Sequence, residues 1–153
     1  MKFIADCHLG KIAKYLRIFG FDTLYFQSID DDDIVTIAKE QNRLVLTSDK
    51  ELYQRVKHLN GMYIQHADFL KQLKDIFNHY KLYDKCKPLS RCIECNGTVK
   101  AVDKDEIECI LKPKTSKYFD YFEKCEVCSK VYWHGDHYKN MSKFVNDFLN
   151  KKI

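Results

Sequence analysis

The segment that decides the fold is Asn42-Arg43-Leu44-Val45-Leu46-Thr47-Ser48-Asp49. A polar break at residues 41–43 precedes the apolar run at 44–47, and the chain then becomes polar again. A short run that is apolar on both faces is typical of a central strand in a parallel sheet, because helices cover both faces of such a sheet. Similar short runs at residues 2–5, 23–26 and 62–64 predict three further strands.

Helical periods separate these predicted strands. Apolar residues recur at helical spacing over residues 9–19, 34–38, 52–59 and 69–80, and the first helix is expected to end at Gly20. Strand followed by helix, repeated four times, predicts an α/β domain over residues 1–85, in which helices flank a small, mostly parallel sheet. Residues 86–153 lose this alternation and are expected to form a second domain.

Four of the seven cysteines form two pairs with a two-residue spacer, Cys92 with Cys95 and Cys125 with Cys128. This spacing lets two thiolates converge on one ion, so the pairs predict a structural zinc site of the zinc-ribbon type. The alternatives are four unrelated buried thiols, or a cluster in which Cys86 replaces one ligand. The 29 residues between Cys95 and Cys125 exceed the usual spacing and indicate an insertion.

Three further patterns belong to the second domain. Asn96-Gly97, directly after the first pair, suits a tight turn with positive φ. Residues 131–133 predict a strand of the ribbon. Apolar residues at helical spacing over 141–149 then predict a C-terminal amphipathic helix.

The composition excludes several classes of protein. The chain has 153 residues, of which 45% are hydrophobic and 31% charged, so it is neither disordered nor fibrous. Its net charge of +4 is too small to prove a nucleic-acid partner. No apolar stretch approaches the roughly 20 residues that cross a bilayer, and Asp6 and Lys11 interrupt any signal-peptide core. We therefore expect a soluble cytoplasmic protein with no membrane partner.

Acidic residues follow the predicted strands. Asp6 ends the first strand, Asp49 follows the run at 44–47, and residues 30–33, all aspartate, open the second helix. In an open parallel sheet, ligands bind beyond the carboxyl ends of the strands. Carboxylates gathered there can hold Mg²⁺ or Mn²⁺, which activates a water in phosphodiester cleavage. The alternative is that these aspartates cap helices and interact with helix dipoles.

Basic and histidine residues leave similar alternatives. Lys11, Lys14 and Arg17 recur every third residue and either face a phosphate backbone or form a solvated helix face. His134 and His137 follow the ribbon strand. A turn with hydrogen-bonded imidazoles is favoured there over a second polar site that contacts substrate.

Taken in order, several blocks resemble the PIN-like RNase family named after the C-terminal domain of a nematode mutator exonuclease. The blocks are residues 9–23, 31–38 and 42–52, the two cysteine pairs, and Val131-Tyr132-Trp133-His134-Gly135-Asp136-His137. The resemblance covers roughly residues 2–140. Members of this family join a small PIN-like α/β domain to a C-terminal zinc ribbon, which is the fold that the resemblance implies.

The resemblance also implies an activity, that of a metal-dependent ribonuclease acting on RNA with Mg²⁺ or Mn²⁺. The family's acids match Asp6, Asp49 and Asp31, with Asp30 and Asp32 as alternatives to Asp31. These three carboxylates would be the catalytic metal ligands. In this interpretation the RNA backbone would be held by Lys11, Lys14 and Arg17.

The fourth acid that is common in PIN domains has no clear counterpart, and Glu51 and Asp68 are weak candidates. Its absence favours the main alternative, a non-catalytic RNA- or protein-binding module that keeps the fold. A phosphoacceptor domain of the receiver type would need a further lysine at a strand end and a longer sheet domain, and neither is evident.

Overall fold

The N-terminal part of the chain forms a four-stranded parallel sheet. A computed structural model, which describes residues 1–151, contains the strands β1 (Lys2–Ala5), β2 (Asp22–Tyr25), β3 (Leu44–Thr47) and β4 (Met62–Tyr63). They lie in the order β2-β1-β3-β4, and every neighbouring pair is parallel. The predicted α/β fold is therefore confirmed, with β1 and β3 as the central strands.

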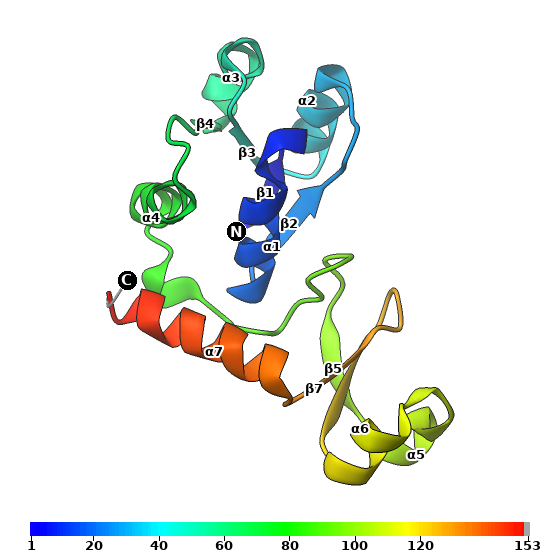
Figure 1. Ribbon diagram of the computed structural model, residues 1–153. Helices are drawn as coiled ribbons and strands as arrows, with labels where there is room; N and C mark the ends of the chain where they lie inside the picture. The colour runs from blue at the N-terminus through cyan, green and yellow to red at the C-terminus, as the bar shows by residue number, and fades with distance from the viewer. Residues whose placement is uncertain (152–153) are drawn as a thin grey trace.

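Helices cover both faces of this sheet (Figure 1). They are α1 (Gly10–Ile18), α2 (Asp31–Glu40), α3 (Lys50–Val56) and α4 (Phe69–Tyr80). Successive strand residues point to opposite faces, so Phe3 packs with the core beneath α1 and α4, and Ile4 with the core beneath α2 and α3. The predicted end of α1 is also found, because Gly20 has φ +90° and a Cβ there would lie 2.0 Å from the carbonyl oxygen of Lys87.

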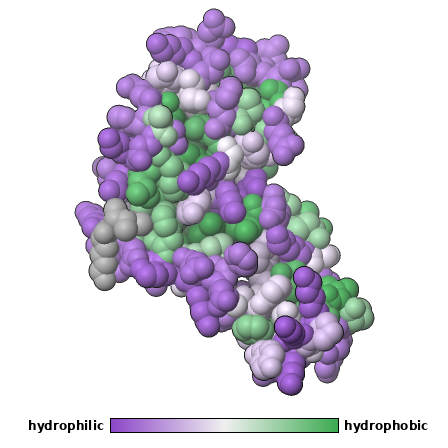
Figure 2. Space-filling model, viewed as in Figure 1, coloured by the Kyte–Doolittle hydropathy of each residue, from purple (hydrophilic) through white to green (hydrophobic). Residues whose placement is uncertain are grey.

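The last helix returns to the α/β core. Helix α7 (Asp136–Leu149) places Phe144 with its ring centroid 4.8 Å from that of Tyr15, and Phe148 4.8 Å from Phe77. Val145 and Phe148 are 2% exposed in the same cluster as the residues of α1 and α4. Figure 2 shows the resulting hydrophobic band in the middle of the molecule, where α1, α4 and α7 lie.

The cysteine pairs lie at one end of a three-stranded antiparallel sheet. Its strands are β5 (Val99–Val102), β6 (Phe122–Cys125) and β7 (Val131–Trp133), in that order. The predicted insertion lies between β5 and β6 and contains the short helices α5 (Lys104–Ile107) and α6 (Pro113–Tyr118), at the lower right of Figure 1. Single-turn 3-10 helices lie at Cys7–Leu9, Lys57–Leu59, Tyr83–Lys85 and Glu108–Ile110.

The two cysteine turns and the sheet β5-β6-β7 are called the ribbon below. Two side chains attach this ribbon to the outer edge of β2. Asn96 Oδ1 accepts a hydrogen bond from the backbone N–H of Thr23 at 2.8 Å. Arg17 Nε donates to the carbonyl oxygen of Thr23 at 2.9 Å, and its Nη1 donates to the carbonyls of Ile93 and Glu94 at 3.1 and 2.8 Å. Because an open strand edge invites pairing with another chain, the ribbon protects the edge of this sheet.

Asp22 at the start of β2 completes this connection. It accepts hydrogen bonds from Arg43 Nη1 at 2.6 Å and from Asn96 Nδ2 at 2.8 Å, and Arg91 lies 3.6 Å away. Burial raises the pKa of Asp22, but the hydrogen bonds from Arg43 and Asn96 and the two guanidinium charges outweigh it and lower the pKa below its ordinary value. The ionised Asp22 thus links the sheet to the ribbon.

Some boundaries differ from those that the sequence predicts. The C-terminal helix begins at Asp136 instead of residue 141, because its first five residues are mostly polar and carry no hydrophobic period. The division at residue 85 stays a proposal, and α7 packs on the first part of the chain. The expected second domain runs to residue 153, but residues 152 and 153 lie outside the described residues. Within residues 1–151, no helix has the length and apolar character needed to cross a membrane.

Candidate functional site

The carboxylate of Asp6 lies at the carboxyl end of β1 and is 3% exposed. Its Oδ2 accepts hydrogen bonds from Thr47 Oγ1 at 2.5 Å and from the backbone N–H of Ser48 at 2.8 Å. Its Oδ1 accepts from the backbone N–H of His8 at 2.9 Å. A buried carboxylate is costly unless it is hydrogen-bonded, so these three donors hold Asp6 in one orientation.

Asp49 lies at the carboxyl end of the neighbouring strand β3 and caps α3. Its Oδ1 accepts from the backbone N–H groups of Glu51 and Leu52 at 2.6 and 2.9 Å, as expected for an N-cap. The backbone N–H of Asp49 donates to Thr47 Oγ1 at 2.9 Å. One buried hydroxyl therefore joins Asp6 to Asp49, and the two predicted acids lie on the same edge of the sheet.

Asp31 lies in the first turn of α2, which follows β2 on the other side of β1. It is partly buried, whereas Asp30 and Asp32 are exposed. Asp32 forms an ion pair with Arg55 of α3 and is therefore engaged in joining two helices. Of the three rival acids, Asp31 is the one that is partly buried.

The three carboxylates do not form a closed cluster. Within residues 1–151, the four ribbon cysteines are the group of metal-type ligands whose atoms all lie within 4.8 Å of one another, and Asp6, Asp31 and Asp49 form no such group. The chemistry of the donors nevertheless suits Mg²⁺ or Mn²⁺, which take oxygen ligands. Mg²⁺ keeps several of its waters and is commonly bound through one or two carboxylates, so widely spaced acids are compatible with it.

The two candidates for a fourth acid differ in their surroundings. Asp68 caps α4, and its Oδ1 accepts from the backbone N–H of Lys71 at 2.9 Å. Glu51 is exposed in the first turn of α3, next to Asp49. Neither residue forms part of a close group of metal-type ligands within the described part of the chain.

The three predicted RNA-binding residues separate into two kinds. Lys11 and Lys14 are exposed on α1, and Lys11 Nζ lies 4.2 Å from the centroid of the Phe69 ring. Arg17 is 6% exposed, and its guanidinium is occupied by carbonyls of β2 and of the first cysteine pair. Burial lowers the pKa of Arg17, although the cysteines and acids nearby act in the opposite direction. Arg17 therefore connects the ribbon to the sheet, and we do not retain it as an RNA contact.

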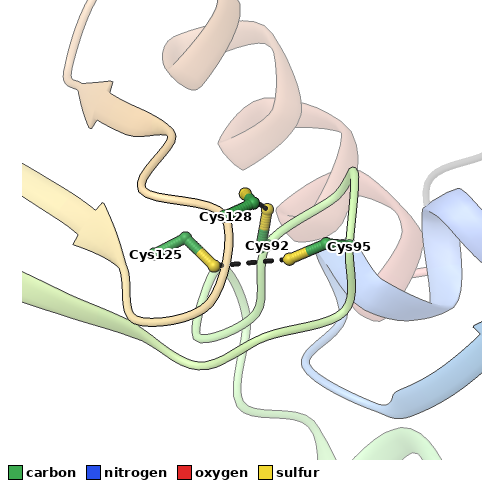
Figure 3. Close-up of side chains that lie close together, drawn as sticks. All are labelled: Cys92, Cys95, Cys125 and Cys128. Carbon is green, nitrogen blue, oxygen red and sulfur yellow. Dashed lines mark hydrogen bonds between the residues drawn. The ribbon is translucent and has the colours of Figure 1, made fainter.

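The four ribbon cysteines converge as predicted (Figure 3). The Sγ atoms of Cys92 and Cys128 are 3.6 Å apart, and those of Cys95 and Cys125 are 3.4 Å apart. Thiolates that bind one zinc at about 2.3 Å in a tetrahedron lie about 3.8 Å from one another, so the arrangement is compatible with a structural zinc ion. Cys86 is not in this cluster, and burial raises the pKa of its thiol to about 11.

The surroundings of Cys92 favour its thiolate. Burial raises its pKa, but hydrogen bonds from the Tyr132 hydroxyl and from the backbone N–H groups of Cys95 and Glu94 outweigh it and lower the pKa to about 7. The Tyr132 oxygen lies 3.0 Å from Cys92 Sγ. Burial and the neighbouring thiol raise the pKa of Tyr132, which keeps the hydroxyl as a donor. The thiolate is the form that binds metals.

Both cysteine turns have the same backbone geometry. The residue after each second cysteine is left-handed, Asn96 with φ 70° and Ser129 with φ 61°. Gly97 is needed for a different reason, because a Cβ there would lie 2.8 Å from Cys125 Sγ. The predicted tight turn after the first pair is thus present, and asparagine, not glycine, takes the positive φ.

Sequence reasoning missed the residues that join these parts. Thr47 was noted only as the end of a strand, and Asn96 only as a turn residue, yet Thr47 joins two acids and Asn96 joins the ribbon to β2. The position of a threonine at the end of the strand, two residues before Asp49, was the signal that could have indicated this role of Thr47. No local signal identifies the partner of Asn96, because Thr23 lies 73 residues away.

The chain bends after β7, but within residues 1–151 no hydrogen bond to either imidazole is found, so the hydrogen-bonded turn favoured by the sequence is not formed. The imidazole of His134 stacks on Tyr138 with ring centroids 3.9 Å apart and lies 4.9 Å from Tyr121. His137 instead lines a groove between the ribbon and α1. His134 is not among the residues that line this groove.

Comparison with protein-family models gives a match over most of the chain. The family model described as Mut7-C RNAse domain matches residues 1–145, which include the sheet, the ribbon and most of α7. This match confirms the resemblance drawn from the sequence blocks, and the description is that of a ribonuclease-like domain. No curated protein and no solved structure shows significant similarity to the chain.

Proposed function

This chain belongs to the Mut7-C RNAse domain family, and from that premise we propose that it is a metal-dependent ribonuclease that cleaves RNA internally. The observation that carries the proposal is the pairing of Asp6 and Asp49 through Thr47 at the carboxyl edge of a parallel sheet. Ligands of such sheets bind beyond this edge, where the strand order reverses. Here β1 and β3 are the adjacent strands from which the chain continues in opposite directions.

We assign each acid a separate task. Asp6 is held by three hydrogen bonds and provides a carboxylate of fixed orientation at the carboxyl end of β1. Asp49 uses Oδ1 to cap α3, so Oδ2 takes no part in the cap and would serve as the metal ligand. Asp31 provides a third carboxylate from α2. Asp6, Asp31 and Asp49 would hold a divalent ion, and that ion would supply an activated water and neutralise charge on the phosphate.

The exposed lysines of α1 support an RNA substrate. Lys11 lies one residue after the start of α1, next to the edge that carries Asp6, and Lys14 lies one turn further along the helix. Both are exposed and positively charged, so they suit contacts with phosphates of the RNA backbone. We propose a structural role for the zinc ion of the ribbon, because structural zinc sites supply folding energy directly.

Replacing Asp49 by asparagine tests the proposal. Asparagine is about as good an N-cap as aspartate, so the cap of α3 and the stability of the fold are expected to remain. The negative charge on the metal ligand is lost, and single-turnover cleavage of an RNA oligonucleotide in Mg²⁺ or Mn²⁺ should fall by orders of magnitude. Asp103→Asn, which changes another helix-capping position in the ribbon insertion, is the matched control and should cleave normally.

The pair Asp31→Asn and Asp32→Asn tests the third ligand. The first change should reduce cleavage strongly, whereas the second should only loosen the contact between α2 and Arg55. Normal cleavage by Asp49→Asn would exclude Asp49 as a ligand. If the wild-type protein binds several RNAs but cleaves none of them in either metal, the non-catalytic binding module is the better description.

A further inference from the structure

A groove lies between the α/β part and the ribbon, away from the acidic edge. Its volume is about 400 Å³, within the range of small-molecule and cofactor pockets. It is bounded by α1, β7, the first turn of α7 and the first cysteine turn, and the lining includes none of Asp6, Asp31 and Asp49. The residues that matter here are Lys14, Tyr15, Lys130, Trp133, His137 and Tyr138.

Rings form much of the groove wall. Trp133 remains 37% exposed, which is unusual for a large hydrophobic residue beside a cavity that it could otherwise help to close. Its indole is held against the backbone of the following turn, since a Cβ on Gly135 would lie 2.8 Å from Trp133 Nε1. The backbone N–H of Gly135 also donates to the carbonyl oxygen of Trp133 at 2.9 Å. One edge of the indole therefore lies close to Gly135, and the ring remains partly accessible.

The charged residues that line the groove are Lys14, Lys130 and Asp136. Lys130 Nζ pairs with Glu94 at 2.7 Å, so its charge is largely balanced. Lys14 is exposed and, among residues 1–151, makes no ion pair within 4 Å. An accessible aromatic ring and a lysine without an ion pair, which here line one groove, are the combination with which proteins bind single-stranded nucleic acid, by stacking a base and contacting a phosphate.

We propose that this groove is a second RNA-binding site, in which an unstacked base of single-stranded RNA lies on Trp133 and its phosphate is contacted by Lys14. The inference rests on the proposed function, because it takes the substrate to be RNA. Helix α1 connects the two sites, since it carries Lys14 and Lys11 one turn apart and begins at Gly10, next to the acidic edge. A strand held in the groove can thus continue along α1 towards Asp6.

The geometry selects single strands over duplexes. Bases in a duplex are stacked and paired, and a side-chain platform can reach them only after they are splayed out. A narrow groove with a ring on its wall accordingly suits an unpaired segment, a loop or an end. The ribonuclease would then hold its substrate at the ribbon and cleave it at the sheet edge.

Trp133 is the only tryptophan in the chain, so its fluorescence reports directly on the groove. The full-length protein is titrated with a single-stranded RNA octamer, without added Mg²⁺ or Mn²⁺ and without chelator, so that cleavage is suppressed and zinc is retained. We expect saturable quenching. A blunt RNA duplex of the same sequence and the corresponding mononucleotides should give little quenching at the same concentrations.

Two substitutions at Trp133 separate stacking from folding. Trp133→Leu keeps an apolar side chain but removes the ring, and Trp133→Phe keeps a ring. By fluorescence anisotropy of labelled octamer, Trp133→Leu should weaken binding about 5- to 150-fold, the range for loss of one base–aromatic stack. Trp133→Phe should weaken it much less. Tyr118→Leu, at an aromatic residue that is 69% exposed outside the groove, is the control and should bind normally.

Salt dependence tests the phosphate contact. Lys14→Gln should reduce the slope of log Kd against log salt by about 0.7, the value for one phosphate of a single strand. Lys39→Gln on α2, which packs on the other face of the sheet, should leave the slope unchanged. Thermal melts and zinc content verify that each variant is folded.

The outcomes distinguish this site from the proposed function. If Trp133→Leu and Trp133→Phe bind equally well, or if duplex or free nucleotide quenches as strongly as the octamer, the RNA site is refuted. It is refuted likewise if no RNA quenches Trp133 while the protein still cleaves RNA. If the octamer binds as expected but nothing is cleaved in Mg²⁺ or Mn²⁺, the groove stands and the nuclease proposal fails.

Discussion

Replacing Thr47 by valine removes one hydroxyl and keeps the size and branching of the side chain. In the wild-type protein this hydroxyl is fully buried, donates to Asp6 Oδ2 at 2.5 Å and accepts from the backbone N–H of Asp49 at 2.9 Å. Valine leaves the Asp6 carboxylate and the backbone N–H of Asp49 without this hydroxyl as a partner. Thr47→Ser is the matched control, because serine keeps the hydroxyl and loses only the methyl group.

The contacts allow the cost of each change to be compared. A hydrogen bond to a charged group contributes about 1.5–3 kcal/mol and one between neutral groups about 0.5–1.5 kcal/mol. Because the backbone N–H of Asp49 is close to solvent, we expect Thr47→Val to lower the free energy of unfolding by about 2–4 kcal/mol. Loss of a buried methyl in Thr47→Ser should cost about 1 kcal/mol. The serine variant should therefore be the more stable one.

Chemical denaturation in urea measures both free energies, and cleavage of an RNA oligonucleotide at several Mn²⁺ concentrations measures the effect on the site. The valine variant should need more Mn²⁺ for half-maximal cleavage, because Asp6 is no longer held by that hydroxyl, and the serine variant should resemble the wild type. The reasoning is refuted if the valine variant is as stable as the serine variant or more so. Burial of apolar surface, and not the hydrogen bonds, would then determine the role of Thr47.

Three further predictions concern the ribbon and its contact with the sheet. Asn96→Ala leaves the buried N–H of Thr23 unpaired, so it should lower the free energy of unfolding by about 1–3 kcal/mol more than Ser129→Ala does. Ser129 is the control because it is the equivalent left-handed residue of the second cysteine turn and has no such partner. Equal losses of unfolding free energy in urea denaturation would contradict this prediction. Cys92→Ser, or removal of zinc by a chelator, should unfold residues 86–135, and a stoichiometric metal assay that finds no zinc in protein purified without chelator would exclude the site. Because the folded-state pKa of Asp22 is lowered, its contribution should be present above its unfolded pKa of about 3.9 and be lost as the pH falls through the folded value. The difference in unfolding free energy between wild type and Asp22→Asn should accordingly shrink below about pH 4 and stay constant near neutrality.

Much of the fold could be predicted because its signals are local. The run at 44–47 and the periodic helices depend on the burial of successive residues, and the structure places β3, α1 and α4 close to the predicted ranges. The strands β5 and β6 were not predicted, because they are partly exposed and are interrupted by lysine and glutamate. Pattern reasoning is weakest where a strand has no buried face of its own.

In the candidate site, too, some residues could be predicted from the sequence and others could not. The positions of Asp6 and Asp49 followed from the rule that loops after parallel strands meet at one edge. The function of Arg17 did not follow, because its spacing with Lys11 and Lys14 is the same whether it faces solvent or a neighbouring element. Only the first cysteine turn, 76 residues away at Ile93, determines that Arg17 is buried.

The sequence alone therefore determined the order of strands and helices in the α/β part, the convergence of the four cysteines and the sheet edge at which Asp6 and Asp49 lie. Each of these depends on residues that are close in the chain or on a general rule of parallel sheets. The tertiary structure decided that α7 completes the α/β core, that Asn96 covers the edge of β2, and that Trp133 lines a groove with Lys14. These contacts join segments tens of residues apart, and they form because folding brings together polar groups and apolar faces that no local pattern pairs.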